Sequence, residues 1–333
     1  MNNKLIILIV IILAVGAGFY VYSDDATAKD DAIKIRLLVA HQPVSVFERS
    51  NEIFAKELLN GSNGTMELEV LSPSDFGYET DIPLADVYEL MDSGQIDIST
   101  AITSAFQREA PRSNVFLMPF LFSNYDSLVG FLDSDEAKEI LSDITSSTRV
   151  TALAFTFSGG FRVIALHEEG VDSEEDLSGK TIASLGDDIT KSALSHLGVE
   201  VVSISEASDL SALDGTEVAY TRFAQLDKPT TMRSIVETGH SALVTTLIIN
   251  DAIYDSLTTE QKNALMESAQ TAAKAERADS KSLADKTRSE LLENGASIVA
   301  LSDERRHELR DANNSLYTSF ESEFGMDLLD RNL

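Results

Sequence analysis

The chain lacks cysteine altogether and is poor in basic residues. The absence of cysteine excludes disulfides, thiolate metal sites, cysteine nucleophiles and a lipid attached to an N-terminal cysteine. Only 26 lysines and arginines face 55 aspartates and glutamates over 333 residues, so the formal net charge is −29. This charge disfavours nucleic acid and anionic membrane surfaces as partners, because both would repel the protein at long range. One local basic site for a small anion remains compatible with it.

Motifs that carry enzymatic chemistry are also missing. The five histidines form no His-Glu-x-x-His arrangement, and neither a Gly-x-Ser-x-Gly elbow nor a phosphate-binding Gly-x-x-x-x-Gly-Lys-Ser/Thr loop occurs. Neighbouring acids, such as Glu168-Glu169, stand in a polar turn, which indicates solvated charge. We therefore expect a protein that is not an enzyme, with no catalytic residues, no metal and no cofactor.

The N-terminus has the pattern of an export signal. Lys4 precedes the apolar residues 5–22, and Ala26-Thr27-Ala28 follows as a small-x-small cleavage pattern, so that Lys29 would begin the mature chain. The alternative is a retained anchor, because the apolar run is long for a signal peptide and barely long enough to span a bilayer. Either way, the body of the protein is expected outside the cytoplasmic membrane, in the periplasm.

The order of the expected elements predicts two α/β lobes. Strands are expected at 32–40, 66–71 and 96–102, with helices at 45–59 and around 87–91 between them. This βαβαβ order is typical of a lobe with a mainly parallel sheet. A helical pattern over 124–146, a strand at 150–157, and a second alternating series then follow, with a helix at 188–196, a strand at 199–203, a helix at 207–213 and a strand at 216–223.

A long helix is expected to join the lobes. Thr258 and Gln261 form a capping-box pattern, and Gly295 gives a C-terminal stop, which predicts a helix over 259–294. At 1.5 Å per residue it would span about 54 Å, more than one small lobe. A coiled coil is the alternative, although apolar heptad positions are not sustained. A strand at 242–250 precedes this helix, and a strand at 297–301 and a helix at 303–324 follow it.

The fold class expected from these elements is α/β, as a two-lobed periplasmic-binding-protein-like fold with a hinge and a lobe-bridging helix. The signal peptide or anchor would occupy residues 1–28. Lobe 1 would comprise 29–157 and 240–282, and lobe 2 would comprise 158–239 and 283–333. Proteins of this architecture close by hinge motion around a ligand.

The chain is organised around residues 154–186, which predict a strand, a glycine break and two further strands. Arg162 stands among apolar residues just after Gly159 and Gly160. An arginine there is costly unless its charge is paired, and its planar fork suits a carboxylate. The glycines would let a ligand approach the backbone. One interpretation is an anion-binding arginine in a cleft. The alternatives are an arginine on a solvated strand face or one paired with an internal acid.

Four motifs in order carry a family resemblance. They are Ser93-Gly94-Gln95-Ile96-Asp97, the apolar residues 115–122, residues 158–162 followed by Glu175-Asp176-Leu177-Ser178-Gly179-Lys180, and residues 247–261. From about residue 33 to the C-terminus the chain resembles the extracytoplasmic solute-binding proteins of TRAP transporters, of the dicarboxylate-binding (DctP) type. The resemblance implies that an arginine holds the ligand carboxylate while the lobes close. The loaded protein would then dock on the TRAP permease subunits of the membrane, a secondary transporter driven by an ion gradient.

The resemblance implies a role for Arg162. The chain departs from the family pattern at residue 183, which leads to a hypothesis about Arg222. Arg162 matches the Gly-x-Arg position of the family. The family's principal carboxylate-clamping arginine corresponds to residue 183, where this chain has Ala183. We hypothesise that Arg222 supplies the missing positive charge, the alternative being a surface arginine. A standard dicarboxylate is therefore less secure as ligand, and a monocarboxylate, a hydroxy or keto acid, or an unusual organic acid remains open.

Further candidates for ligand contact come from the family resemblance, which implies a contact at His41 after the first strand and an acid at Glu79, and from the ends of expected strands. They are His41, Glu79, Thr100, Thr103, Phe161, Ser184, Tyr220 and Phe223. The alternatives are a structural role for His41, a solvated loop carboxylate for Glu79, and core packing for Tyr220 and Phe223. The predicted function is capture of a small organic acid for TRAP transport. The alternative is a membrane-anchored sensor or scavenging protein of the same fold without a permease.

Overall fold

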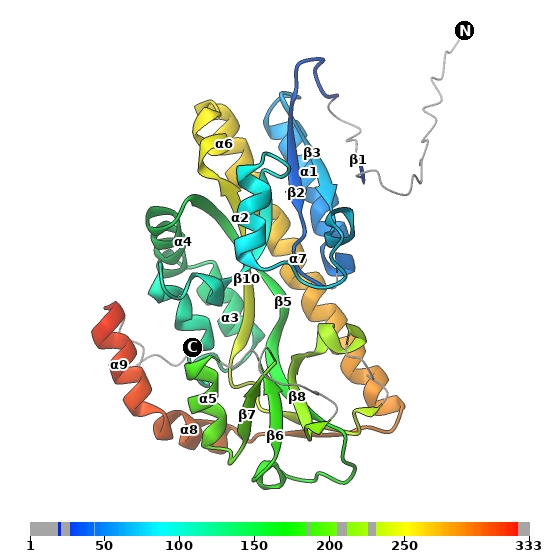
Figure 1. Ribbon diagram of the computed structural model, residues 1–333, viewed down its shortest axis with the longest axis vertical. Coiled ribbons are helices and arrows are strands. Elements are labelled where there is room, and N and C mark those ends of the chain that lie inside the picture. The colour runs from blue at the N-terminus through cyan, green and yellow to red at the C-terminus, as the bar shows by residue number, and fades with distance from the viewer. Residues whose placement is uncertain are drawn as a thin grey trace.

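The computed structural model describes residues 19–20, 27–42, 44–184, 187–204, 212–225 and 231–325. Figure 1 shows two α/β lobes along the long axis, with strands β5 and β10 and helix α7 running between them. The two-lobed fold expected from the sequence is therefore confirmed. The segment 1–18, which holds most of the expected export signal, lies outside the described residues.

Lobe 1 is built on a mixed sheet. Its strands are β1 (Phe19–Tyr20), β3 (Met66–Leu71), β2 (Ile33–Leu38), β4 (Ile98–Ile102), β10 (Ala242–Asn250) and β5 (Val150–Leu166), in that spatial order. Strand β2 is parallel to β3 and β4, whereas β10 is antiparallel to β4 and β5. The expectation of a mainly parallel sheet was wrong, because β10 returns from the other lobe and enters the sheet in the opposite direction.

Helices cover the lobe 1 sheet and close its core. They are α1 (Glu48–Gly61), α2 (Leu84–Asp92), α3 (Tyr125–Leu132), α4 (Asp135–Ser147) and α6 (Asp251–Ser256). The pattern over 124–146 predicted one helix, but two form, because the Ser134 side chain caps a new helix by accepting the N–H of Ala137. Residues 114–122 are buried as expected, and Phe116 packs edge-on against Phe131 in the lobe 1 core.

Lobe 2 contains the second half of β5 and five further strands. They are β6 (Thr181–Ser184), β7 (Glu200–Ser203), β8 (Gly215–Ala219), β9 (Ser234–Glu237) and β11 (Ser297–Ala300), and its helices are α5 (Asp188–Ser195) and α8 (Asp303–Ala312); helix α9 (Asn314–Phe324) follows α8 in the chain. Strands β6, β7 and β8 run parallel, and β8 pairs antiparallel with β5. A strand was expected at 216–223, but strand β8 ends at Ala219 and the next residues, Tyr220–Gln225, form a 3-10 helix. Most of the helix expected at 207–213 lies outside the described residues.

The C-terminal segment differs from the expected single helix over 303–324. It breaks at Asn313, and α9 then packs against lobe 1 rather than lobe 2. Tyr317 is fully buried in the lobe 1 core, where its hydroxyl donates to the carbonyl of Pro119 at 2.7 Å. The chain therefore returns to the first lobe at its end.

The hinge region is one strand rather than two strands with a break. Strand β5 runs for 17 residues through Gly159 and Gly160, which have φ values of 123° and 71°. The register with β10 shifts here, between Leu243 and Val244. Tyr125 donates to the carbonyl of Gly159 at 3.1 Å, and a Cβ at position 160 would lie 2.6 Å from its ring. Glycine is therefore required at position 160, because its φ is positive and because a side chain there would clash with the Tyr125 ring.

Helix α7 (Thr259–Glu293) bridges the lobes, as the sequence predicted. The capping box of Thr258 and Gln261 is present at its start. Leu265 lies in a lobe 1 cluster with α1, and Ala284 lies in a lobe 2 cluster with the strands β8 and β9. Figure 1 shows the helix crossing from the upper to the lower lobe, so one continuous helix contacts both lobes.

Candidate ligand-binding site

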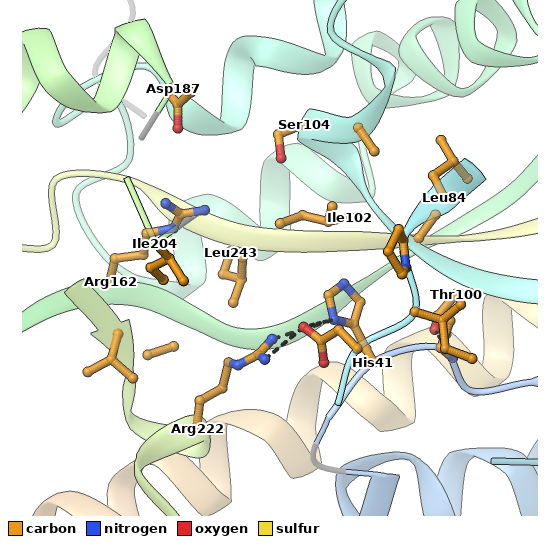
Figure 2. Close-up of a pocket in the computed structure, with 18 of the residues that line it drawn as sticks. His41, Leu84, Thr100, Ile102, Ser104, Arg162, Asp187, Ile204, Arg222 and Leu243 are labelled. Atoms are coloured by element: carbon orange, nitrogen blue, oxygen red, sulfur yellow. Dashed lines mark hydrogen bonds and ion pairs between the residues drawn. The ribbon is translucent and has the colours of Figure 1, made fainter. Parts of the chain in front are cut away.

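A cavity of about 630 Å³ lies between the lobes. Lobe 1 contributes residues at the carboxyl ends of β2 and β4, and lobe 2 contributes strand β8 with the residues around it. Ligand sites of α/β folds form beyond the carboxyl ends of parallel strands. The volume falls within the range of small-molecule sites. Figure 2 shows the side chains that meet in this space from both lobes.

Arg162 reaches the cavity from the lobe 2 half of β5. The residue is 3% exposed, and its Nη1 donates to Oε1 of Glu217 at 3.0 Å. Its Nη2 is buried and has no acceptor. A buried guanidinium nitrogen without a partner is costly. This arginine thus combines two alternatives that the sequence left open, because it is paired with an internal acid and still lines a cavity.

Glu217 is the centre of a buried network. Besides Arg162, it accepts hydrogen bonds from Ser184 Oγ and from His240 Nε2, the latter at 2.8 Å. Burial alone would raise the pKa of Glu217, but the charge of Arg162 and the hydrogen bonds from His240 and Ser184 outweigh it. The pKa of Glu217 therefore lies well below its ordinary value, and the carboxylate is ionised. Because it can only accept, His240 Nε2 carries the proton of that hydrogen bond.

A second charged group crosses the cleft. Asp81 of lobe 1 accepts from Arg222 Nη2 of lobe 2 at 2.7 Å and lies 3.1 Å from His41 Nδ1. The backbone N–H of Gln42 donates to its other oxygen at 2.8 Å. Burial alone would raise the pKa of Asp81, but the hydrogen bond and charge of His41, together with Arg222, set it far below its ordinary value. An ionised carboxylate thus joins the lobes at the edge of the cavity.

Four of the ten candidate ligand contacts line the cavity: His41, Thr100, Arg162 and Arg222. Thr100 lies near the end of β4, and its Oγ1 accepts the N–H of Ala40 at 2.9 Å. Figure 2 places His41 and Thr100 on the lobe 1 side, with Arg162 and Arg222 on the lobe 2 side. The structure therefore brings these four together from segments that are far apart in the sequence.

The other six candidates lie elsewhere. Glu79 is exposed, and Thr103 is buried with its hydroxyl donating to the carbonyl of Val244. Phe161 packs edge-on against Tyr125 in lobe 1. Ser184 contacts Glu217 behind the cavity wall. Tyr220 and Phe223 stack on each other in the lobe 2 core, and Tyr220 donates to Glu237 at 2.7 Å.

Sequence reasoning missed the acids of the site. Asp81 and Glu217 line the cavity, and Asp187 at the start of α5 does so as well. Asp187 carries a usable signal, since it stands in Asp-x-x-Thr order before a helical pattern, and its side chain does accept the N–H of Thr190. Glu217 could have been suspected as an acid in an apolar strand. Nothing local marks Asp81.

The family assignment rests on most of the chain. The family model for bacterial extracellular solute-binding proteins, family 7 (DctP), matches residues 40–323. The chain belongs to this family. The resemblance to TRAP solute-binding proteins is therefore confirmed, and the protein is a solute-binding protein rather than an enzyme.

Relatives of similar length share this fold. A solute-binding protein of Chromohalobacter salexigens is 22% identical over 268 residues, which cover 79% of this chain and 78% of the relative. A TRAP periplasmic solute-binding protein of Pseudomonas putida F1, solved with bound D-glucuronate, has a TM-score of 0.74 at 22% identity, covering 90% of this chain and 99% of that one. One from Ralstonia eutropha H16, solved with bound (S)-2-acetolactate, has a TM-score of 0.73 at 20% identity, covering 89% and 96%.

Among the described residues, no group of three or more histidines, aspartates and glutamates is placed to hold a metal ion. None of the helices formed by those residues is long and apolar enough to cross a membrane.

Proposed function

We propose that this protein binds a small organic acid between its two lobes and delivers it to a TRAP-type secondary transporter in the membrane. The observation that carries the proposal is Nη2 of Arg162, a buried cationic donor beside the cavity with no acceptor. A ligand carboxylate would supply that acceptor. Charge-assisted hydrogen bonds of this kind contribute about 1.5–3 kcal/mol.

The surroundings of Arg162 support a positioning role for Glu217. Its carboxylate accepts from Nη1 at 3.0 Å, so the guanidinium plane is fixed before a ligand arrives. Strand pairing supports the same arrangement, because Arg162 and Glu217 lie on the neighbouring strands β5 and β8. A donor held in place loses little conformational freedom when it binds a ligand, which favours affinity.

The ligands of two similar proteins point to the same chemistry. D-glucuronate and (S)-2-acetolactate, bound in the two solved TRAP proteins, are both carboxylates. In the present chain a carboxylate would meet Arg162 even though Ala183 replaces the family's clamping arginine.

Acid and amide pairs test the carboxylate requirement. A thermal-shift screen would compare organic acids with their primary amides, which have nearly the same shape without the negative charge. We expect acids to raise the melting temperature of the protein and the matching amides to leave it unchanged, because only a bound ligand stabilises the folded form by mass action. Equal shifts from acids and amides would contradict the proposal.

Delivery to the permease and export to the periplasm need separate measurements. Sequencing the N-terminus of the secreted protein should give Lys29 as its first residue if the signal is cleaved. Membrane vesicles that contain the permease subunits should accumulate a radiolabelled ligand only when this protein is added outside. Uptake at the same rate without the protein would argue against a transport role.

A further inference from the structure

The charges around the cavity leave one cationic donor available. Among the described residues that line it, only Arg162 has a buried nitrogen without an acceptor. The other lining arginine, Arg222, is already paired with Asp81 at 2.7 Å. Two arginines therefore face three lining acids, namely Asp81, Glu217 and Asp187, with His41 beside them. A ligand with two carboxylates would bring its second negative charge to a lining whose described residues offer no second free cation.

The remaining wall of the cavity is largely apolar. More than half of the lining residues have apolar side chains, with Ile82, Leu84, Ile102, Ile204 and Leu243 the largest aliphatic ones. Figure 2 shows Ile204 next to Arg162, Leu84 at the opposite side, and Ile102 and Leu243 between them. Ile204 is 43% exposed, one of three large hydrophobic residues exposed in the described part of the chain. Its apolar surface would be covered by the first carbons of the hydrocarbon part of a ligand whose carboxylate is bound by the arginine.

Several polar groups of the lining are occupied by the protein itself. Thr100 Oγ1 accepts the N–H of Ala40 at 2.9 Å, and Thr216 Oγ1 donates to the carbonyl of Ala183 at 3.3 Å. Ser104 and Gln107 add two polar side chains to the described lining. The three lining acids are likewise engaged, Asp81 with Arg222, Glu217 with Arg162 and Asp187 with Thr190. The described lining therefore offers few groups to the hydroxyls of a sugar acid, and hydroxyls buried without partners disfavour binding.

We infer that the ligand is a monocarboxylate with an apolar body, rather than a dicarboxylate or a polyhydroxylated acid. The carboxylate accepts from Arg162 Nη2, and the hydrocarbon part extends past Ile102 and Leu243 toward Leu84. The inference rests on the proposed function, since it assigns a substrate class to the same site. The cavity of about 630 Å³ has room for a body larger than that of a four-carbon acid.

Three acids with the same six-carbon chain separate the possibilities. Hexanoate has one carboxylate and an apolar body, and adipate has a carboxylate at each end. Gluconate has one carboxylate and a hydroxyl on each of its remaining carbons. Calorimetric titration of the purified full-length protein should give a Kd for hexanoate at least about tenfold lower than for adipate or gluconate, because burial of an unpaired charge or hydroxyl is unfavourable. From butanoate to octanoate, each added methylene should lower the Kd about three- to fourfold.

A matched pair of isoleucine variants tests the apolar wall. Ile102→Thr keeps the β-branched shape but places a hydroxyl in the cavity, and it should raise the Kd for hexanoate about threefold or more. Ile33→Thr makes the same change on β2 away from the cavity and should leave the Kd unchanged. Equal effects of the two variants would overturn the assigned path of the hydrocarbon.

The outcomes distinguish this inference from the proposed function. Tighter binding of hexanoate, lost when Arg162 is changed to lysine, supports both. Tight binding of adipate or gluconate with the same dependence on Arg162 overturns the substrate class and leaves the proposed function standing. Binding of no acid in the series, or binding that is indifferent to Arg162→Lys, overturns both.

Discussion

Replacement of Arg162 by lysine separates the two tasks of its guanidinium. Nη1 donates to Glu217 at 3.0 Å, whereas Nη2 is buried without an acceptor, on a residue that lines the cavity. A lysine ammonium keeps the positive charge beside the ionised Glu217, but as a single point it cannot serve both partners in the planar geometry of the fork. We therefore expect Arg162→Lys to fold and to bind its ligand weakly.

The magnitudes follow from the interactions that are kept and lost. Loss of a charge-assisted hydrogen bond costs about 1.5–3 kcal/mol, which corresponds to a Kd raised roughly 10- to 150-fold. The free energy of unfolding should change much less than in Arg162→Ala. That variant leaves the Glu217 carboxylate buried with only the hydrogen bonds of His240 and Ser184, and breaking a buried pair in this way costs about 3–5 kcal/mol.

Two measurements on the same preparation check this reasoning. Calorimetry with the tightest acid found for the wild type gives the Kd, and urea unfolding gives the stability. Arg149→Lys is the matched control, because Arg149 pairs with Asp92 at the surface away from the cavity, and neither value should change. A wild-type Kd for Arg162→Lys would refute the role given to Nη2. A stability loss as large as that of Arg162→Ala would refute the role given to the retained charge.

Three further predictions concern the cleft and the hinge. The pKa of Asp81 is lowered in the folded state, so its carboxylate stabilises the protein above the ordinary carboxyl pKa of about 4, and this contribution is lost as the pH falls further. The melting temperature of Asp81→Asn should therefore fall less than that of the wild type between pH 5 and 3. Parallel curves of melting temperature against pH for the two proteins would contradict this. Burial raises the pKa of Glu276, so its contribution to wild-type stability is lost as the pH rises above about 4.3, the pKa of glutamate in the unfolded chain. The melting temperature of Glu276→Gln should therefore rise relative to that of the wild type from pH 5 to 8. A difference in melting temperature that stays constant with pH would sink the idea. Gly160→Ala should lower the free energy of unfolding by about 1–3 kcal/mol more than Gly170→Ala, because both have positive φ but only the former meets the Tyr125 ring, and equal losses in urea unfolding would argue against that contact.

Local patterns predicted the elements with their own sequence signals. Strand β3 (Met66–Leu71) forms at the predicted residues because apolar and acidic residues alternate there. Helix α7 (Thr259–Glu293) begins at its capping box and ends before Gly295. Arg162 was singled out because a charge among apolar strand residues must have a partner. Each of these inferences needed a window of neighbouring residues and no knowledge of the fold.

The partners of Arg162 depend on tertiary structure instead. Glu217 is 55 residues away in the chain and reaches the arginine through the pairing of β5 with β8. Asp81 belongs to the other lobe, so its contact with Arg222 requires both lobes and the hinge. Tyr220 was expected in the cleft, but the chain turns into a 3-10 helix after β8 and directs this ring into the lobe 2 core. No local pattern contains that change of direction.

The two charged groups of the site differ in a way that suits a receptor that must both bind and release. The pair of Arg162 and Glu217 belongs to neighbouring strands of one lobe and is almost fully buried, with side-chain exposures of 3% and 2%. Such a pair stays formed, because separating it would leave a buried charge. The pair of Arg222 and Asp81 joins the two lobes with exposures of 24% and 32%, where ion pairs contribute about 0–1 kcal/mol. Closure is therefore weak by itself, and under the proposed function a ligand bound at the rigid arginine would shift the lobes toward the closed form.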